Sequence, residues 1–177
     1  MRIICWTVAH TVVFAVLILI SFSTTSQNNW LLFVILISLG LVQLPFLARQ
    51  LRWWSWLWVP VSYLGLMLSF AGGWWFFLFL GWGIGLAQSP LLLMGKFQRV
   101  FAWSTASGIG WGAGVFAGGW LMERLAPGGS PEAIRMAILY SSVATIYGLA
   151  TACALHVMES VPKAEERVSV TKVIGGN

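Results

Sequence analysis

The sequence predicts an all-α fold, a polytopic transmembrane bundle of six helices with an internal parallel two-helix repeat. Charged residues make up only 8% of the 177 residues, too few to cover the surface of a soluble domain. Long apolar runs recur along the chain, and each is about 19 to 23 residues, enough to cross a hydrocarbon core about 30 Å thick. The basic residues gather on alternate connections between these runs, as expected when loops alternate between two sides of a membrane.

Six apolar runs are predicted to span the membrane as helices, because backbone inside lipid must satisfy its hydrogen bonds internally. They are Ile3–Phe22, Trp30–Ala48, Trp53–Ala71, Trp74–Met94, Val100–Met122 and Ala137–Met158. Residues 1–158 then form one transmembrane domain, followed by a cytoplasmic tail, 159–177. The first run, with Arg2 before it and small residues after it, also fits a cleaved signal peptide, whose removal would leave five spans. Its length exceeds a usual signal core and favours a retained helix.

The distribution of charge predicts the orientation of this bundle. With the N-terminus in the cytoplasm, the basic residues on the inner side are Arg2, Arg49, Arg52, Lys96, Arg99, Lys163, Arg167 and Lys172. The outer side holds only Arg124 and Arg135, accompanied by Glu123 and Glu132. This excess of positive charge inside predicts a bacterial inner or photosynthetic membrane protein with both termini cytoplasmic. Because the basic residues lie singly or in pairs, nucleic-acid binding is not predicted.

An internal repeat appears when the sequence is shifted by 45 residues. The aligned pairs include Trp30 with Trp75, Gly40 with Gly85, Gln43 with Gln88, Pro45 with Pro90, Leu47 with Leu92, Trp58 with Trp103, Ser62 with Ser107 and Gly65 with Gly110. Matched Gln, Pro and Trp predict two duplicated hairpins, about 30–71 and 75–116, related by an axis along the membrane normal. Residues 148–150 repeat the Gly-Leu-Ala of residues 85–87. This fainter echo suggests the hypothesis that the last span pairs with the first as a third hairpin, in a pseudo-three-fold ring.

Four aligned polar residues, Gln43, Gln88, Ser62 and Ser107, are the candidates for a functional site. A glutamine amide inside an apolar span costs free energy until it finds a partner. One interpretation is hydrogen bonding between helices, about 0.6–2 kcal/mol, helped by the backbone carbonyl that the proline after each glutamine frees. The other is a ligand-binding site for a solute, a lipid headgroup or the peripheral groups of a pigment.

The only histidines, His10 and His156, lie in the first and last predicted spans. A neutral imidazole in an apolar helix can ligate the metal of a chlorophyll-type macrocycle, so both are candidate pigment ligands. Hydrogen bonding to a neighbouring helix is the alternative. The sequence shows no cluster of metal ligands, and no metal site is predicted.

Glycines at four-residue spacing predict close helix packing, because small residues let helix backbones approach one another. They are Gly81, Gly85, Gly108, Gly110, Gly112, Gly114 and Gly118. Their partner is either another span of this chain or another protein.

A family resemblance rests on the second repeat. The residues that carry it are Gly85, Gln88, Leu92, Trp103, Gly110, Trp111 and Gly114. The stretch from about 40 to 118 resembles a repeated Gly-x-x-Gln, Trp and Gly-Trp pattern in uncharacterised multi-pass membrane proteins of cyanobacteria and other phototrophs. This sequence departs from the pattern by a proline two residues after each glutamine and by lacking Gly-Trp in its first copy. The resemblance implies a photosynthetic membrane but no particular activity.

The central parts of the predicted spans carry no charged residue, and no nucleophile with a base or phosphate-binding loop is recognisable. An enzyme is therefore not predicted. We predict a non-catalytic accessory or scaffold subunit that packs against lipids and other membrane proteins, or against copies of itself. The setting implied by the resemblance is a photosynthetic assembly, with a chlorophyll-type pigment or carotenoid as candidate cofactor. The alternative is a small transporter or channel for a neutral or apolar solute, built from kinked Gln-x-Pro helices.

Overall fold

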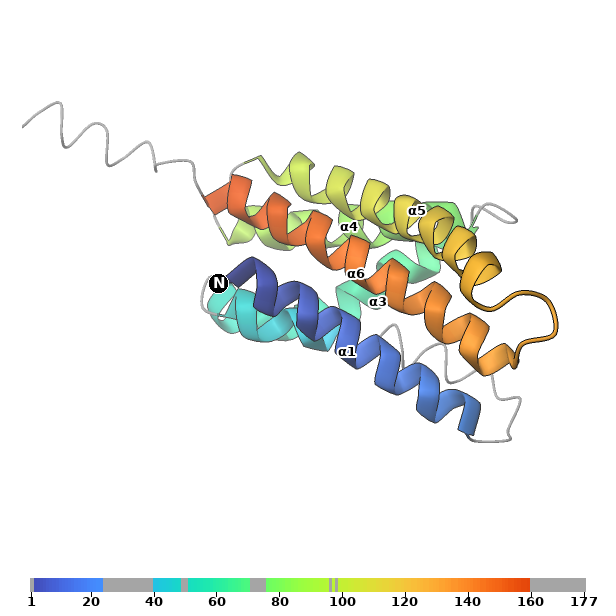
Figure 1. The fold of residues 1–177 in the computed structure, drawn as a ribbon. Coiled ribbons are helices and arrows are strands. Elements are labelled where there is room, and N and C mark those ends of the chain that lie inside the picture. The colour runs from blue at the N-terminus through green and yellow to red at the C-terminus, as the bar shows by residue number, and fades with distance from the viewer. Residues whose placement is uncertain are drawn as a thin grey trace, which may run out of the picture.

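The structure is a computed structural model that describes residues 2–23, 40–48, 51–70, 76–95, 97 and 99–159. All regular structure in these residues is helical, so the predicted all-α fold class is confirmed. The helices are α1 (Arg2–Ser23), the short 3-10 helix η1 (Arg52–Leu57), α3 (Trp58–Phe70), α4 (Phe76–Met94), α5 (Val100–Leu125) and α6 (Glu132–Glu159). A further helical segment, 40–48, precedes η1 (Figure 1).

The breaks around α5 fall at residues whose backbone suits turns. The helix begins directly after Arg99, which has a left-handed φ of 55°. In the connection to α6, Gly129 has a φ of 106°, a conformation that glycine adopts without a steric penalty. Pro127 and Pro131 in the same connection lack the amide hydrogen that a continuing helix needs.

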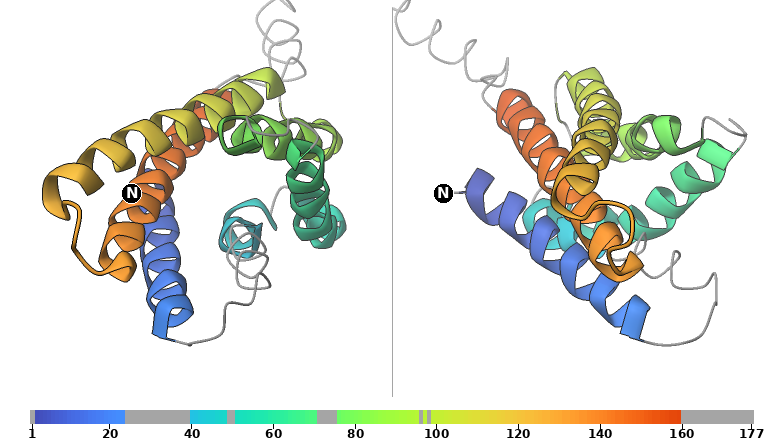
Figure 2. Two further views of the ribbon diagram at one scale, coloured as in Figure 1. Left: turned by 90° about the vertical axis from the view of Figure 1, so that its right-hand side faces the viewer. Right: turned by 45° about the vertical axis from the view of Figure 1, so that its right-hand side comes forward.

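The helices form a closed ring. Consecutive helices pack side by side, α3 on α4, α4 on α5 and α5 on α6. Helix α6 also packs along α1, which brings the two ends of the described chain together (Figure 2). The segment 40–48 lies between α1 and α3, because Gln43 bonds to side chains of both helices. The start of α1 and the end of α6 lie at the same end of the ring (Figure 1).

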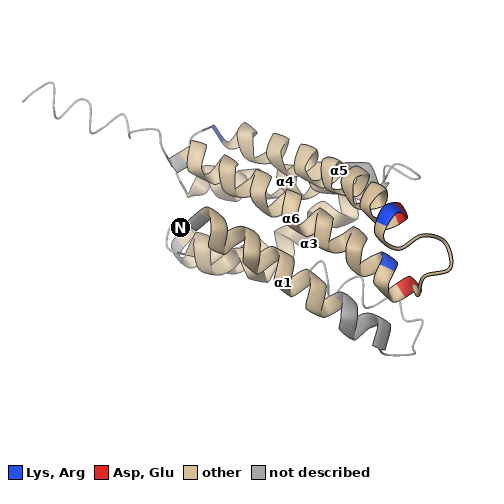
Figure 3. Ribbon diagram, viewed as in Figure 1, with Lys and Arg blue, Asp and Glu red and all other residues tan. Residues whose placement is uncertain are grey.

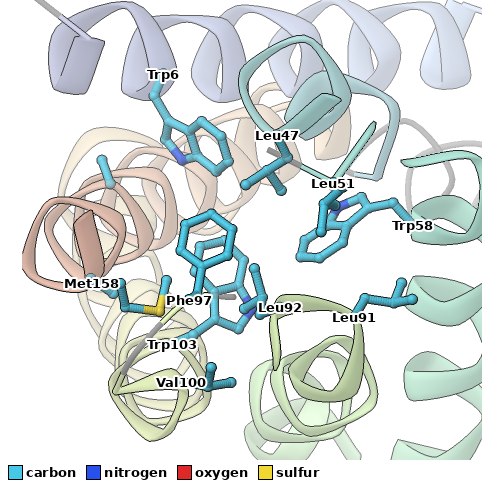
Figure 4. Packing of buried hydrophobic residues seen from close by; sticks show 12 residues of the cluster. Trp6, Leu47, Leu51, Trp58, Leu91, Leu92, Phe97, Val100, Trp103 and Met158 are labelled. Carbon is cyan, nitrogen blue, oxygen red and sulfur yellow. The ribbon is translucent and has the colours of Figure 1, made fainter. Parts of the chain in front are cut away.

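The interior of the ring holds two apolar clusters. Near the end that carries the start of α1, tryptophans from three helices, Trp6, Trp58 and Trp103, pack with Leu47 and Leu92 (Figure 4). Further along the axis, a second cluster is built around Phe14, Leu66, Leu80, Trp111 and Tyr147. The buried aromatic cluster thus draws on both ends of the sequence.

Of the described residues, one helix is long and apolar enough to cross a membrane by its own length and composition, Glu132–Met158. Two shorter apolar helical stretches, Ile3–Leu17 and Phe79–Met94, fall below that length. This criterion supports one of the six predicted spans, and the complete set of six stays a prediction. The predicted tail after residue 159 and the first part of the earlier repeat unit, 30–39, lie outside the described residues.

Candidate functional site

The two glutamines of the repeat meet at the centre of the ring. Gln43 comes from the segment 40–48 and Gln88 from α4, and both side chains have no exposed surface. The Nε2 of Gln88 donates to the Oε1 of Gln43 over 3.3 Å. The shift of 45 residues therefore relates two side chains that touch across the ring.

Each glutamine is also bonded to the tryptophan of its own hairpin. The indole Nε1 of Trp58 donates to Gln43 Oε1 over 2.8 Å, and Trp103 Nε1 donates to Gln88 Oε1 over the same distance. The two tryptophan rings meet edge to face with centroids 5.8 Å apart. Each hairpin therefore contains the same buried pair, in which the indole holds the amide in a fixed orientation.

A third pair of this kind joins the two ends of the chain. The Nε1 of Trp6 on α1 donates to Thr151 Oγ1 on α6 over 3.1 Å, and the Trp6 ring lies edge to face on Trp103 at 6.2 Å. Thr151 follows Gly148 by three residues, as Gln88 follows Gly85. Thr151 therefore stands in α6 where the other hairpins have glutamine.

The glycine contacts of the three hairpins match as well. A Cβ added to Gly40 would lie 3.4 Å from Ser62, which follows its tryptophan by four residues. A Cβ on Gly85 would lie 2.9 Å from the Cβ of Ser107, and one on Gly148 would lie 3.2 Å from the Cβ of His10. Ser107 and His10 likewise follow Trp103 and Trp6 by four residues. The three hairpins, 40–48 with α3, α4 with α5, and α6 with α1, thus pack in the same way around one axis.

Hydrogen bonds between neighbouring hairpins form a polar ring around this axis. Gln88 Nε2 donates to Ser62 Oγ over 2.7 Å, and Gln43 Nε2 lies 3.3 Å from His10 Nε2 and 3.4 Å from the Tyr147 hydroxyl. His10 Nδ1 lies 2.8 Å from the backbone oxygen of Trp6. Because that oxygen only accepts, Nδ1 carries the hydrogen, and Nε2 is free to accept from the Gln43 amide. Both ring nitrogens of His10 are therefore engaged inside the protein.

The other predicted site residues lie in different surroundings. Ser107 is buried on α5, and its hydroxyl has no hydrogen-bond partner. His156 is exposed near the end of α6 and does not join the polar ring. The structure therefore brings together Gln43, Gln88, Ser62 and His10, while His156 stays outside the polar ring.

Most of the predicted packing glycines serve contacts inside the ring. Added Cβ atoms at Gly81 and Gly85 would meet α5, and at Gly110, Gly114 and Gly118 they would meet α6. One on Gly108 would meet the indole of Trp82 on α4. Gly112 is the exception, with nothing within 4 Å. The glycine ladder of α5 therefore packs this helix against both its neighbours.

Trp6, Thr151 and Tyr147 are site residues that the local sequence pattern alone does not single out. Two spacings held the signal: Trp6 precedes His10 as Trp58 precedes Ser62, and Thr151 follows the Gly-Leu-Ala echo as Gln88 follows its counterpart. These spacings become one hairpin only when the last helix is paired with the first. That pairing depends on the closure of the ring in space.

The chemistry of the ring is neutral hydrogen bonding. Its members are amides, hydroxyls, indoles and one imidazole, and the part of the chain that the structure describes holds no group of three or more potential metal ligands. Interhelical bonds of this kind contribute about 0.6 kcal/mol each and up to about 1.7 kcal/mol. Their geometry fixes which helices are neighbours and in which rotation. Comparisons with protein-family models, with curated proteins and with solved structures found no match.

Proposed function

We propose that the protein is a six-span integral membrane protein that acts as a non-catalytic accessory or scaffold subunit. The observation that carries the proposal is that the ring buries polar side chains in its interior and exposes apolar side chains on its outside. Gln43, Gln88 and Thr151 are fully buried, whereas the large apolar side chains of Phe101 and Phe116 are 75% and 71% exposed. A protein in water has the opposite arrangement, and extensive exposed apolar surface marks contact with lipid or with a partner.

Exposed apolar stripes run along the described helices. On α1 the stripe consists of Ile4, Val8, Val12 and Val16, which recur every four residues and so share one face. The other helices carry Leu64 and Leu68 on α3, Phe79, Leu86 and Leu93 on α4, Ile109 on α5, and Ile134, Leu149 and Val157 on α6. Because these stripes occur on helices all around the ring, lipid chains are the neighbour that best matches them.

The positions of the charges support two membrane surfaces. The described charged residues lie near the two ends of the ring, and the parts of the helices between them carry none (Figure 3). Arg99 directly precedes α5, which begins at the end that holds the start of α1 (Figure 1). An ion pair of 2.9 Å joins Arg135 to Glu123, on the parts of α5 and α6 at the other end. Beside that pair, Arg124 stacks over the exposed ring of Trp120, as is typical of the interface between lipid and water. Because the sequence predicts an excess of basic residues on the side of the N-terminus, we assign that end of the ring to the cytoplasm.

The outward face of α5 supports the role of a scaffold. Gly112 and Gly119 leave open space beside the helix, and the exposed side chains of Ile109 and Phe116 flank them. A surface of small residues between large apolar ones suits close packing of a helix from a partner protein or a second copy. The resemblance to phototroph proteins makes a photosynthetic assembly the proposed setting, with pigment or carotenoid among the contacts.

Membrane topology provides the first test. In a variant without its native cysteines, Gly128→Cys in the connection between α5 and α6 should react with an impermeant maleimide added to the outside of intact cells. Trp56→Cys in η1, which is also exposed, should react only after the cells are opened. Equal labelling from one side, or release of the protein by alkaline carbonate, would contradict six spans.

Gentle purification provides the second test. Extraction in mild detergent followed by absorption spectroscopy should recover a stoichiometric partner protein, with or without bound pigment. Gly112→Leu should reduce partner recovery while leaving the fold intact. Recovery of the protein with neither a partner nor a pigment would contradict the scaffold role.

A second candidate function is transport of a neutral solute, favoured by the gathering of uncharged polar side chains from all three hairpins on one axis. Replacement of both Gln43 and Gln88 by leucine should then abolish the flux of the neutral solute into liposomes that contain the protein. The pair of Gln43→Asn and Gln88→Asn keeps the amides and serves as the milder variant if the leucine pair fails to fold. Unchanged flux in a folded double-leucine variant would exclude this pathway.

A further inference from the structure

One position of the polar ring lacks the amide that the other two possess. Gln88 reaches Ser62 in the hairpin beside it, and Gln43 reaches His10 in the same sense of rotation. Under the three-fold relation, the residue at the position of Thr151 should reach Ser107. By this relation, the Ser107 hydroxyl lies where the amide of a third glutamine would bond, and the chain has no glutamine at that position.

Thr151 cannot supply that bond. Its hydroxyl accepts from Trp6 Nε1 over 3.1 Å and donates to the backbone oxygen of Tyr147 over 2.8 Å, so its only hydrogen is used. The Tyr147 hydroxyl accepts from Gln43 over 3.4 Å and is within hydrogen-bonding reach of Ser107. Even so, Ser107 Oγ has no exposed surface and no hydrogen bond that meets ordinary distance and angle limits.

A second buried polar atom without a partner lies one helical turn away. Trp111 follows Ser107 by four residues on α5, is 2% exposed, and its Nε1 has no acceptor. Its ring meets Tyr147 edge to face at 5.9 Å. The equivalent residues of the other hairpins are Leu66 and Phe14, which have no polar atom to satisfy. The two unpartnered atoms thus lie one turn apart on the same face of α5, and both residues lie close to Tyr147.

Buried polar groups without partners are rare because each costs free energy, and a bound molecule is a common reason for their presence. We propose that Ser107, Trp111 and Tyr147 form a binding site for one small neutral molecule with both a hydrogen-bond donor and an acceptor. The molecule accepts from the Trp111 indole and bonds to the Ser107 hydroxyl. Water is the smallest such occupant, and a small amide matches the group that occupies the other two positions. The interior location makes this inference independent of the proposed scaffold role.

The test uses the full-length protein in lipid nanodiscs with ¹⁵N-labelled tryptophan indoles. The Trp111 indole, assigned through Trp111→Phe, should show through-space contacts to bound water and, after acetamide is added, to acetamide. The indoles of Trp58 and Trp103 are internal controls without such contacts, because their hydrogens are bonded to glutamine. Water contacts alone would identify the occupant as solvent, and acetamide contacts would identify a site for small amides. A Trp111 indole with neither contact would overturn the proposal.

Two variants check where the molecule binds. Ser107→Ala removes one of its partners and should cause loss of the acetamide contact at Trp111. Ser62→Ala, the equivalent change in the first hairpin, should leave it in place. Thr151→Gln supplies the third amide from within the chain and should also displace acetamide. If Ser107→Ala and Ser62→Ala have the same effect on the Trp111 signal, the assignment to Ser107 is wrong.

Discussion

The two hairpins that carry glutamine and the hairpin of α6 with α1 meet the same bonding requirement with different side chains. In the first two, an amide accepts from a tryptophan and donates to the neighbouring hairpin. In the third, Thr151 accepts from Trp6 and donates to backbone, while His10 takes the place of a serine. The tryptophan and the glycine are kept in all three, and only the polar partners differ.

Helix packing constrains the glycine of each hairpin more tightly than it constrains the polar residue. Gly40, Gly85 and Gly148 stand at equivalent places beside the paired helix, so a side chain there would meet the neighbouring helix. The polar position requires only an acceptor at the right place for the indole, a requirement that an amide and a hydroxyl both meet. Threonine is shorter than glutamine, and Thr151 makes no hydrogen bond to Ser107, whose hydroxyl is left without a partner.

The largest expected effect comes from Gln88→Leu. The change removes three side-chain bonds and leaves buried polar atoms on Trp103 and Ser62. We expect the free energy of unfolding to fall by about 2–4 kcal/mol, because unsatisfied buried groups bear the cost of desolvation. Denaturant titration in mixed micelles, followed by circular dichroism, measures it. The exposed Leu86→Ala on the same helix is the control, and an equal loss in both variants would contradict a role for the polar ring.

Alanine substitutions at the three equivalent glycines rank the tightness of the hairpins. An added Cβ would lie 2.9 Å from the backbone of Ser104 at Gly85, 3.2 Å from His10 at Gly148 and 3.4 Å from Ser62 at Gly40. Overpacking costs about 1–3 kcal/mol, so Gly85→Ala should lose that much, Gly148→Ala less and Gly40→Ala least. Thermal unfolding of the three variants measures the order. The reverse order would show that the hairpins pack differently.

Thr151→Val tests the hairpin that lacks glutamine. Valine keeps the shape of threonine but removes the acceptor of Trp6, so one buried bond is lost. We expect a loss of about 1 kcal/mol, smaller than for Gln88→Leu. A double-mutant cycle with Trp6→Phe should show coupling between the two residues. Additive losses would mean that the Trp6–Thr151 contact contributes nothing.

The smallest effect is expected from Gly112→Ala, on the outward face of α5. No atom lies within 4 Å of the added Cβ, and alanine favours helix by about 1 kcal/mol over glycine. Stability in detergent should therefore stay the same or rise slightly. A marked loss of stability would show that this face is packed inside the protein.

Sequence reasoning captured the helical class and the equivalence of Gln43 and Gln88, because both are written in local patterns. Hydrophobic run lengths predict helices, and a fixed shift of 45 residues predicts equivalent places. One of the two interpretations of these amides is hydrogen bonding between helices, helped by the backbone carbonyl that each proline frees. The structure shows that the amides bond to each other and to indoles, a serine and a histidine. The identity of a partner depends on rotamers and helix rotation, which a linear pattern does not encode.

By itself, the sequence determined that this chain is helical, apolar and built on a repeated Gly-x-x-Gln element, since composition and periodicity are properties of the chain alone. The pairing of α6 with α1 is only a hypothesis from the sequence, and the tertiary structure decides it, because Trp6 and Thr151 lie 145 residues apart and meet only when the ring closes. The same closure buries Thr151 in the third hairpin, at the position that holds an amide in the other two. Which polar atoms are satisfied is therefore a property of the ring.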